Sequence, residues 1–252
     1  MPIYLLLLAA MPKEPLVNVD ETPWNEKVKV PWLWVFISNS IVLFVIGKRQ
    51  QEVVLRVLTK AFTGWLMSDG LLLYRIFPKR LRCLAHLIRK AYGLSESLTE
   101  EAREFGNTAL AVLGSELNYR LGECSLETVR HRLDAFHEYC ELVIEHDEHQ
   151  KTLELAKEFL NDWNAIWMVV EYPEMPATNN VAERILRHLV IARQISHGTR
   201  TAEGSQTVAV LASIIETGRL RGIKIWDFLP RVITARRRGE MPPDMPMPAL
   251  FG

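Results

Sequence analysis

The sequence predicts an α/β fold, in which a mixed β-sheet is flanked by helices. Short β-rich runs fill the first 70 residues, one amphipathic helix interrupts them, and helical patterns dominate from about residue 81 to residue 170. The chain has 252 residues, of which 48% are hydrophobic, so it has enough apolar surface for a substantial core. These features exclude a disordered tail.

The first three strands are predicted at 16–19, 32–37 and 41–46. The first run ends at Asp20, and Ser38-Asn39-Ser40 separates the second from the third. Such polar residues between β-rich runs are typical of tight turns. We therefore expect a three-stranded meander.

An amphipathic helix is predicted at 50–61, because apolar residues recur there with helical spacing. A fourth strand, 64–67, then leads to Asp69. Three strands, a helix and a parallel-type return match the order of a ribonuclease H-like sheet. This order places Asp20 and Asp69 at neighbouring strand ends.

Helices are predicted through the middle of the chain, at 83–92, 99–114, 125–146 and 151–167. The segment 172–176 ends this region, because its two prolines interrupt helical hydrogen bonding. Asn179 or Asn180 can then cap a helix that carries Glu183 and Arg187 on one face. Further helices are expected at 208–215 and from 226, and the tail after Arg238 should be loose.

The net charge of zero conceals a division along the chain. The balance of Lys and Arg over Asp and Glu is +7 in residues 1–95, −12 in residues 96–175 and +5 in residues 176–252. A polyanion should be attracted to a surface built from the two outer segments. The alternative is that the acidic stretch is only a solvated helical face.

Targeting signals are weak. Three scattered cysteines do not make a disulfide framework, which favours a reducing compartment such as the cytoplasm. The apolar run Ile3–Met11 is far shorter than the roughly 20 residues that a membrane-spanning helix needs. We expect no membrane anchor.

Several short motifs that contain acidic and basic residues resemble motifs of the transposases of the insertion sequence 66 family, which are of the DDE type. Two of them are Val19–Trp24 and Met67–Gly70, and Cys83-Leu84-Ala85-His86 also fits the family. The most specific stretches are Asn179–Arg184, Leu189–Arg200 and Ser213–Thr217.

The resemblance implies that Asp20, Asp69 and Glu183 are catalytic and bind two Mg²⁺ or Mn²⁺ ions. Asp20 and Asp69 would share one ion, and Glu183 would complete the second site with Asp20. Two divalent metals can activate a nucleophile and stabilise a leaving oxygen in phosphodiester chemistry. Carboxylates are the hard oxygen ligands that such ions prefer.

Each site residue also has a structural interpretation. Asp20 could form a turn at a strand end, and Asp69 before Gly70 could do the same. Glu183 could simply stabilise the first turn of a helix. Cys83 and His86 are metal-ligand types, but no second pair completes a zinc site, so a structural pair is the expectation.

Six arginines could bind phosphate oxygens through bidentate hydrogen bonds. Some of them could instead pair with Glu203, Glu216 or Asp227. Trp24, Trp32 and Trp34 could stack on bases, although packing in the core is the alternative. The six arginines are Arg184, Arg187, Arg193, Arg200, Arg219 and Arg221.

The resemblance also predicts the organisation of the chain. Residues 1–80 would form the first part of the ribonuclease H-like core, 81–175 a helical insertion, 176–235 the part with Glu183, and 236–252 a flexible tail. Related transposases carry a DNA-binding helical region before the first aspartate, so the chain looks amino-terminally truncated.

The function implied is metal-dependent cleavage and strand transfer of a mobile element. The partners would be transposon ends, target DNA and further copies of the chain, at the nucleoid in the cytoplasm, with no membrane. The alternative is an inactive remnant that binds DNA nonspecifically or associates with a full-length transposase. A purely helical scaffold would explain neither the strands nor Asn179–Arg184.

Overall fold

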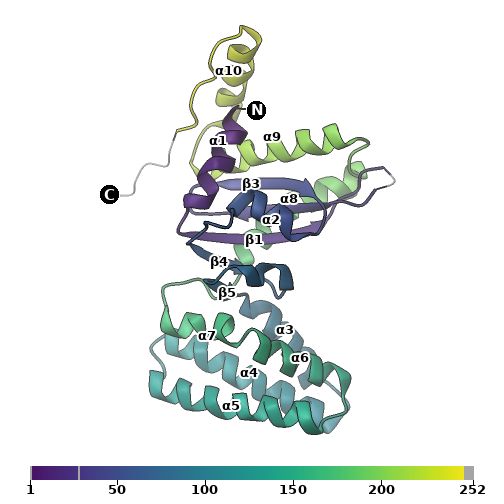
Figure 1. The fold of residues 1–252 in the computed structure, drawn as a ribbon, viewed down its shortest axis with the longest axis vertical. Helices are drawn as coiled ribbons and strands as arrows, with labels where there is room; N and C mark the ends of the chain where they lie inside the picture. The colour runs from purple at the N-terminus through teal and green to yellow at the C-terminus, as the bar shows by residue number, and fades with distance from the viewer. Residues whose placement is uncertain (1, 28, 247–252) are drawn as a thin grey trace. The chain divides into compact units, whose positions relative to one another are not determined.

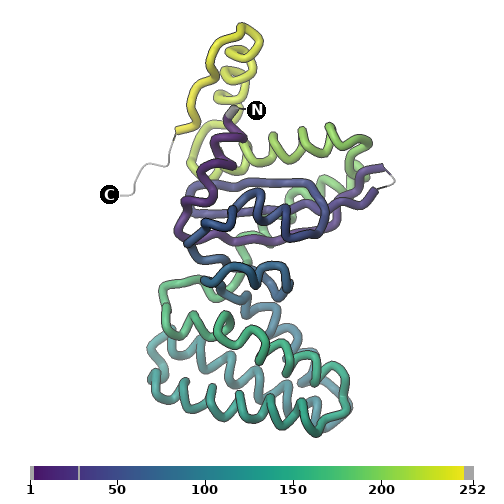
Figure 2. The backbone as a smooth tube through the Cα atoms, in the orientation of Figure 1, coloured from purple at the N-terminus to yellow at the C-terminus, as the bar shows by residue number. Residues whose placement is uncertain are grey.

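The computed structural model describes residues 2–27 and 29–246, and the chain forms two compact units. The sheet unit comprises the described parts of 1–66, 73–79 and 180–252, and the helical unit comprises 67–72 and 80–179. Figure 2 traces the chain through both units. The chain leaves the sheet unit after residue 66, re-enters it for residues 73–79, and returns to it again at residue 180.

A mixed five-stranded sheet with flanking helices places the protein in the α/β class (Figure 1). The strand order is β3-β2-β1-β4-β5, and β1 to β3 form the predicted antiparallel meander. A helix was expected from about residue 81, but β5 begins at residue 80, so that expectation is wrong there. The strands are β1 (Leu16–Pro23), β2 (Trp32–Ile37), β3 (Val42–Gly47), β4 (Trp65–Ser68) and β5 (Arg80–Arg82).

The sheet unit carries five α-helices among its described residues. The predicted helices near 50, 180, 208 and 226 are all present, and those near 208 and 226 are longer than expected. They are α1 (Pro2–Ala10), α2 (Gln51–Leu58), α8 (Asn180–Ser196), α9 (Ala202–Leu220) and α10 (Ile225–Arg237). Two 3₁₀ turns, η1 (Met11–Lys13) and η2 (Leu72–Ile76), complete the elements outside the bundle.

The helical unit is a bundle of α3 to α7, following β5 in the chain (Figure 1). The segment 151–167, predicted as one helix, is two helices that meet at the buried Asp162. Aromatic rings fill the bundle, and Phe136 meets Phe159 edge to face with centroids 4.9 Å apart. The helices are α3 (Leu84–Ser95), α4 (Glu100–Arg120), α5 (Leu126–His146), α6 (Gln150–Asn161) and α7 (Trp163–Glu171).

One hydrophobic core of the sheet unit lies between one face of the sheet and the helices α8 and α9. Residues directly opposite each other in antiparallel strands point to the same face, so the register identifies which side chains reach this core. Its buried members are Trp24, Leu33, Val35, Ile37, Val42, Phe44, Ala182, Leu186, Ala209 and Ala212.

Helix α9 also covers the outer edge of β3, as Figure 1 shows. The Thr217 hydroxyl accepts from the Val42 N–H at 3.0 Å and donates to the Val42 carbonyl at 2.9 Å. The Ser213 hydroxyl accepts from the Phe44 N–H at 2.8 Å. An uncovered edge would leave these backbone groups open to pairing with another chain. Because residues 213 and 217 are four positions apart in α9, both hydroxyls lie on the helical face that covers this edge of the sheet.

The apolar run at the start of the chain forms α1 and packs within the sheet unit. The Tyr4 hydroxyl donates to the Phe44 carbonyl at 3.0 Å, and Met11 is fully buried. The run therefore has partners in this chain, in α9 and β3. Among the described residues, no helix combines the length and hydropathy needed to cross a bilayer.

Candidate active site

Asp20 points to the face of the sheet on which α8 packs. It lies in the middle of β1, directly opposite Val35, which belongs to the core under α8. Two residues further along the same face, the Thr22 hydroxyl accepts from Arg193 Nη1 of α8 at 3.3 Å. The sequence predicted that Asp20 lies at the end of this strand. That prediction is wrong, because the strand continues to Pro23. Asp20 is half-buried beneath a helix instead of forming a turn.

Glu21, the neighbouring acid, faces the opposite side of the sheet. Its carboxylate accepts from the Tyr74 hydroxyl at 2.6 Å and from Arg49 Nη2 at 2.9 Å, and its side chain is only 2% exposed. The Tyr74 ring also meets Trp34, opposite Glu21 in the register, edge to face. The Glu21 carboxylate therefore makes structural contacts within the sheet unit. Of the two adjacent acids, Asp20 is the one that remains a candidate for the active site.

Glu183 lies in the first turn of α8, next to Ala182, which is buried in the core. Its side chain is half-buried. Since α8 packs on β1 and β2, Glu183 and Asp20 belong to the same side of the sheet. The sheet unit thus brings two of the three predicted carboxylates to one face.

Asp69 belongs to the helical unit, in the loop that follows β4. Its Oδ1 accepts from the Leu71 N–H at 3.1 Å, which is the turn chemistry that the sequence offered as an alternative. The carboxylate is half-buried. One carboxylate oxygen can accept a backbone hydrogen bond while the group still binds a cation, so the turn does not remove Asp69 from consideration.

Cys83 precedes the first turn of α3 and is fully buried. Its sulfur accepts from the Asn179 N–H at 3.1 Å, and the Leu84 N–H donates to the Ala177 carbonyl at 2.9 Å. A ring nitrogen of His86 lies within 4.8 Å of the Cys83 sulfur. The hydrogen bonds of Cys83 and Leu84 join the start of α3 to the segment before α8.

The arginines proposed for DNA binding differ in what they contact. Arg184, Arg187 and Arg200 are exposed, whereas Arg193 is half-buried against Thr22. A basic residue on an exposed helical face can reach phosphate oxygens without disturbing the fold. The first three are thus placed to contact a polyanion.

Two of the arginines bind other parts of the sheet unit. Arg219 Nη1 lies 2.6 Å from the Glu216 carboxylate, and the Arg221 Nε donates to the Ser40 carbonyl at 2.7 Å. Burial lowers the pKa of the Arg221 guanidinium below its ordinary value. The pairing with Glu216 is one that the sequence offered as an alternative to DNA contact.

The loop 197–200 is held against the segment that follows β1. Gly198 has a φ of +86°, and a Cβ on it would lie 2.7 Å from the Asn25 Cβ, so only glycine fits. Thr199 accepts from the indole N–H of Trp24 at 3.1 Å. Trp24 is 2% exposed, which supports core packing over base stacking for this tryptophan. The backbone of this loop thus closely approaches the protein's own backbone at Asn25.

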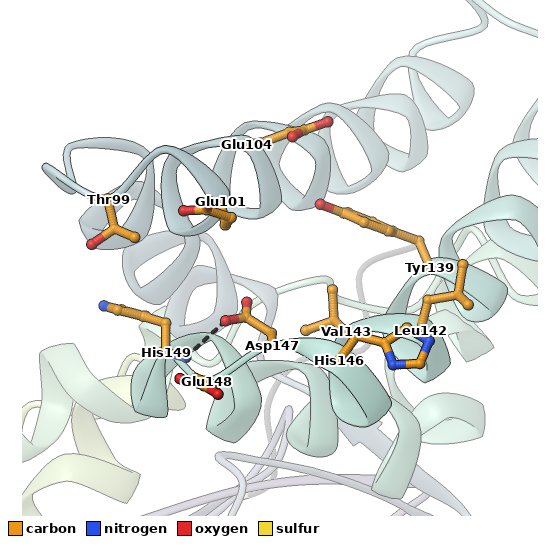
Figure 3. Close-up of a pocket in the computed structure, with 10 residues that line it drawn as sticks. All are labelled: Thr99, Glu101, Glu104, Tyr139, Leu142, Val143, His146, Asp147, Glu148 and His149. Atoms are coloured by element: carbon orange, nitrogen blue, oxygen red, sulfur yellow. Dashed lines mark hydrogen bonds between the residues drawn. The ribbon is translucent and has the colours of Figure 1, made fainter.

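A pocket of about 540 Å³ lies in the helical unit, between α4 and the junction of α5 with α6 (Figure 3). Burial and the nearby charges of Glu104 and Asp147 raise the pKa of Tyr139. Such a lining repels phosphate. The pocket contains none of the predicted site residues, and it is lined by Thr99, Glu101, Glu104, Tyr139, Leu142, Val143, His146, Asp147, Glu148 and His149.

Comparison with known proteins supports the family. Curated proteins give no match to the chain. A family model described as "Transposase IS66 family" matches residues 1–207, a range that includes β1, the loop with Asp69 and the whole of α8. Since this match covers most of the chain, the protein belongs to the IS66 family of transposases.

Proposed function

We propose that this chain is the catalytic core of a DNA transposase with a ribonuclease H-like sheet, and that it cuts phosphodiester bonds and joins strands. Asp20, Asp69 and Glu183 would be its catalytic carboxylates. The observation that carries this proposal is that β1 and α8 present Asp20 and Glu183 on the same side of the sheet.

The donor set fits Mg²⁺ or Mn²⁺, because half-buried carboxylate oxygens are hard ligands in a partly dry environment. Asp20 and Asp69 would hold one ion, and Asp20 and Glu183 the second. Bound there, the two ions would supply an activated nucleophile and a stabilised leaving oxygen. The protein would fix the direction of each carboxylate with a different element: β1 would hold Asp20, α8 would hold Glu183, and the loop after β4 would hold Asp69.

DNA would be bound through its phosphates by basic residues of the sheet unit. Arg184, Arg187 and Arg200 are the first candidates because they are exposed. Arg193 lies further along α8, the helix that also carries Arg184 and Arg187. Arg219 and Arg221 would contribute less, since they already contact Glu216 and Ser40. Phosphate contacts of this kind carry no sequence information. Selection of the transposon ends would need further elements.

The wider organisation follows from this proposal. Residues 81–175 would be a helical insertion between Asp69 and Glu183, 1–80 and 176–235 the two parts of the core, and 236–252 a tail. Strand transfer joins two ends to a target, so a homo-oligomer bound to DNA at the nucleoid is the expected working form.

A second candidate is a transposase remnant that binds DNA without cutting it or associates with a full-length transposase. The basic outer segments favour it as much as they favour the enzyme, because charge alone suffices for nonspecific binding. The two candidates differ only in metal-dependent chemistry.

The test is a nicking and joining assay on precut DNA with 3′-hydroxyl ends, in Mg²⁺ or Mn²⁺. We expect Glu183→Gln to abolish joining while the variant still binds DNA. Glu203→Gln is the matched control, because Glu203 also lies in the first turn of a helix and is exposed. Both swaps remove a charge that favours the helix dipole, worth about 0.3–1 kcal/mol.

Joining that survives in Glu183→Gln would reject the proposed catalytic role. DNA binding by the wild type without any joining in either metal would support the remnant instead.

A further inference from the structure

The loop that carries Asp69 is bound to the residue after β5 by one backbone hydrogen bond, and two further hydrogen bonds lie within the loop. The Ser68 carbonyl, one residue before Asp69, accepts from the Cys83 N–H at 2.9 Å. The Ser68 hydroxyl donates to the Asp69 carbonyl at 3.0 Å, and Asp69 Oδ1 holds the Leu71 N–H at 3.1 Å. The direction of the Asp69 carboxylate therefore depends on where the backbone at 68–71 lies.

Arg82, at the end of β5, is buried in an ion-pair network. Its Nη2 donates to the Glu158 carboxylate, and its Nε lies 3.4 Å from Asp162 Oδ2. Asp162 also accepts from Arg80 Nη2 at 3.2 Å, and Glu158 accepts from Lys90 Nζ at 2.5 Å. The side chains of Arg82 and Asp162 are each 1% exposed. The carboxylates of Glu158 and Asp162 come from the segment where α6 ends and α7 begins, so the bundle holds the guanidinium of Arg82 in place.

Gly70 lies directly against this guanidinium. A Cβ built on Gly70 would be 2.7 Å from Arg82 Cζ and 3.1 Å from Glu158 Oε1. The φ of Gly70 lies outside the left-handed region, so other residues could adopt its backbone conformation. A glycine is needed here because there is no space for a side chain. The long arginine side chain cannot yield easily, since Glu158 and Asp162 hold it.

Stability alone does not explain this network. Removing two charges from water is costly, and replacing a buried ion pair by apolar residues is often neutral or stabilising. Among the described residues, Arg82 Nη1 is buried and has no hydrogen-bond partner. The network therefore suits a role in which a rigid charged group sets the position of a neighbouring segment.

We propose that Arg82 is a positioning residue for Asp69. Held by Glu158 and Asp162, its guanidinium forms the surface on which Gly70 rests, and it thereby sets the direction of the adjacent carboxylate. This inference rests on the proposed function, in which Asp69 is a metal ligand. It gives the helical bundle a part in the chemistry, since two of its carboxylates hold the loop in place.

The experiment compares Gly70→Ala with Gly93→Ala in the whole chain. Gly93 is the matched control, because a Cβ there meets nothing within 4 Å. Hydrogen exchange of the Leu71 amide reports the loop directly, and the Mn²⁺ concentration that gives half-maximal strand joining reports the metal site. For Gly70→Ala we expect at least tenfold faster exchange at Leu71 and a tenfold higher Mn²⁺ requirement. Gly93→Ala should match the wild type in both.

Glu158→Gln tests the network from the other side, with Glu154→Gln as its control. Glu158 is partly exposed and lies one helical turn after the exposed Glu154. We expect Glu158→Gln to raise the Mn²⁺ requirement and the Leu71 exchange in the same sense as Gly70→Ala, with the thermal unfolding midpoint within a few degrees of the wild type. A merely structural network would change the midpoint and leave the Mn²⁺ requirement as it is.

The two proposals fail in different ways. If the wild type joins no strands, the proposed function fails, and the exchange at Leu71 still decides the positioning role. If Leu71 exchange in both Gly70→Ala and Glu158→Gln equals that of the wild type, Arg82 does not position this loop, whatever the activity.

Discussion

The two units of the molecule bury different kinds of polar groups. Apart from the Glu21 carboxylate, which is 2% exposed and bound by Arg49 and Tyr74, the buried polar side chains described in the sheet unit are neutral, namely Asn18, Ser38, Ser205, Ser213 and Thr217. The helical unit buries charges as well, in Arg82, Glu116 and Asp162. Hydroxyls and amides can be satisfied by one or two neutral hydrogen bonds, whereas a buried charge needs a partner of opposite sign.

The same difference separates the supports of the two aspartates. Asp20 lies within a strand whose backbone ladder fixes it, because β1 pairs with β2 from residue 18 to residue 23. Asp69 lies in a loop, and the neighbouring Gly70 rests on the buried charges of Arg82 and Glu158. Backbone ladders tolerate most side-chain changes, but a charged network depends on each member. The carboxylate supported by the helical unit should therefore be the more sensitive to mutation.

The largest expected effect is that of Asp162→Ala. It leaves Arg82 buried beside an empty site and removes a partner of Arg80, so we expect a loss of about 3–5 kcal/mol in the free energy of unfolding. Thr217→Val in the sheet unit removes two neutral hydrogen bonds and should cost about 1–3 kcal/mol. Urea unfolding of both variants measures the difference. Equal losses would remove the contrast between the units.

A smaller effect is expected from Glu116, which lies on α4 and is fully buried. Burial raises the pKa of its carboxyl, against the opposing charge of Arg120. The folded state then holds the proton more tightly than the unfolded state, so this group stabilises the fold at low pH. That contribution is lost as the pH rises from the ordinary glutamate pKa through the raised one.

Glu116→Gln should consequently match the wild type at low pH and be more stable at neutral pH. Urea unfolding of both proteins between pH 4 and pH 8 checks this, with the exposed Glu123 changed to Gln as a control. A stability difference that stays constant across this range would contradict the titration of a buried carboxyl.

The smallest effect concerns the cysteines of the helical unit. Burial, with the nearby Glu141 charge, raises the pKa of Cys140 to about 12, so its thiol stays protonated at pH 8. Cys124 is partly exposed. We expect iodoacetamide to alkylate Cys124 much faster than Cys140 in the folded protein, as read by mass spectrometry. Equal rates would mean that this part of the bundle opens readily.

The strands and most helices could be predicted because their hydrophobic periodicity is local. The strands 32–37 and 42–47 are continuous β-rich runs, and Ser125 accepts from the Thr128 N–H as a helix cap should. Strand β5 was not predicted, because its three residues, two of them arginines, carry no local β signal. Its conformation is fixed by pairing and by Asp162, a residue 82 positions from Arg80.

The candidate site could be predicted only in part for the same reason. The family motifs identify Asp20, Asp69 and Glu183, but no local pattern shows that Glu21 is bound by Tyr74 or that Arg82 lies against Gly70. Those contacts join residues far apart in the chain. The resemblance therefore predicts which residues carry the chemistry, and the structure shows which contacts surround them.

The most direct test of the catalytic assignment uses the two adjacent acids of β1. Asp20→Asn and Glu21→Gln remove the same charge from neighbouring positions that face opposite sides of the sheet. In the joining assay with Mn²⁺, we predict that Asp20→Asn loses all activity and stays folded, while Glu21→Gln is less stable but joins strands at the wild-type rate per folded molecule. Full activity in Asp20→Asn, or loss in a folded Glu21→Gln alone, would contradict the assignment.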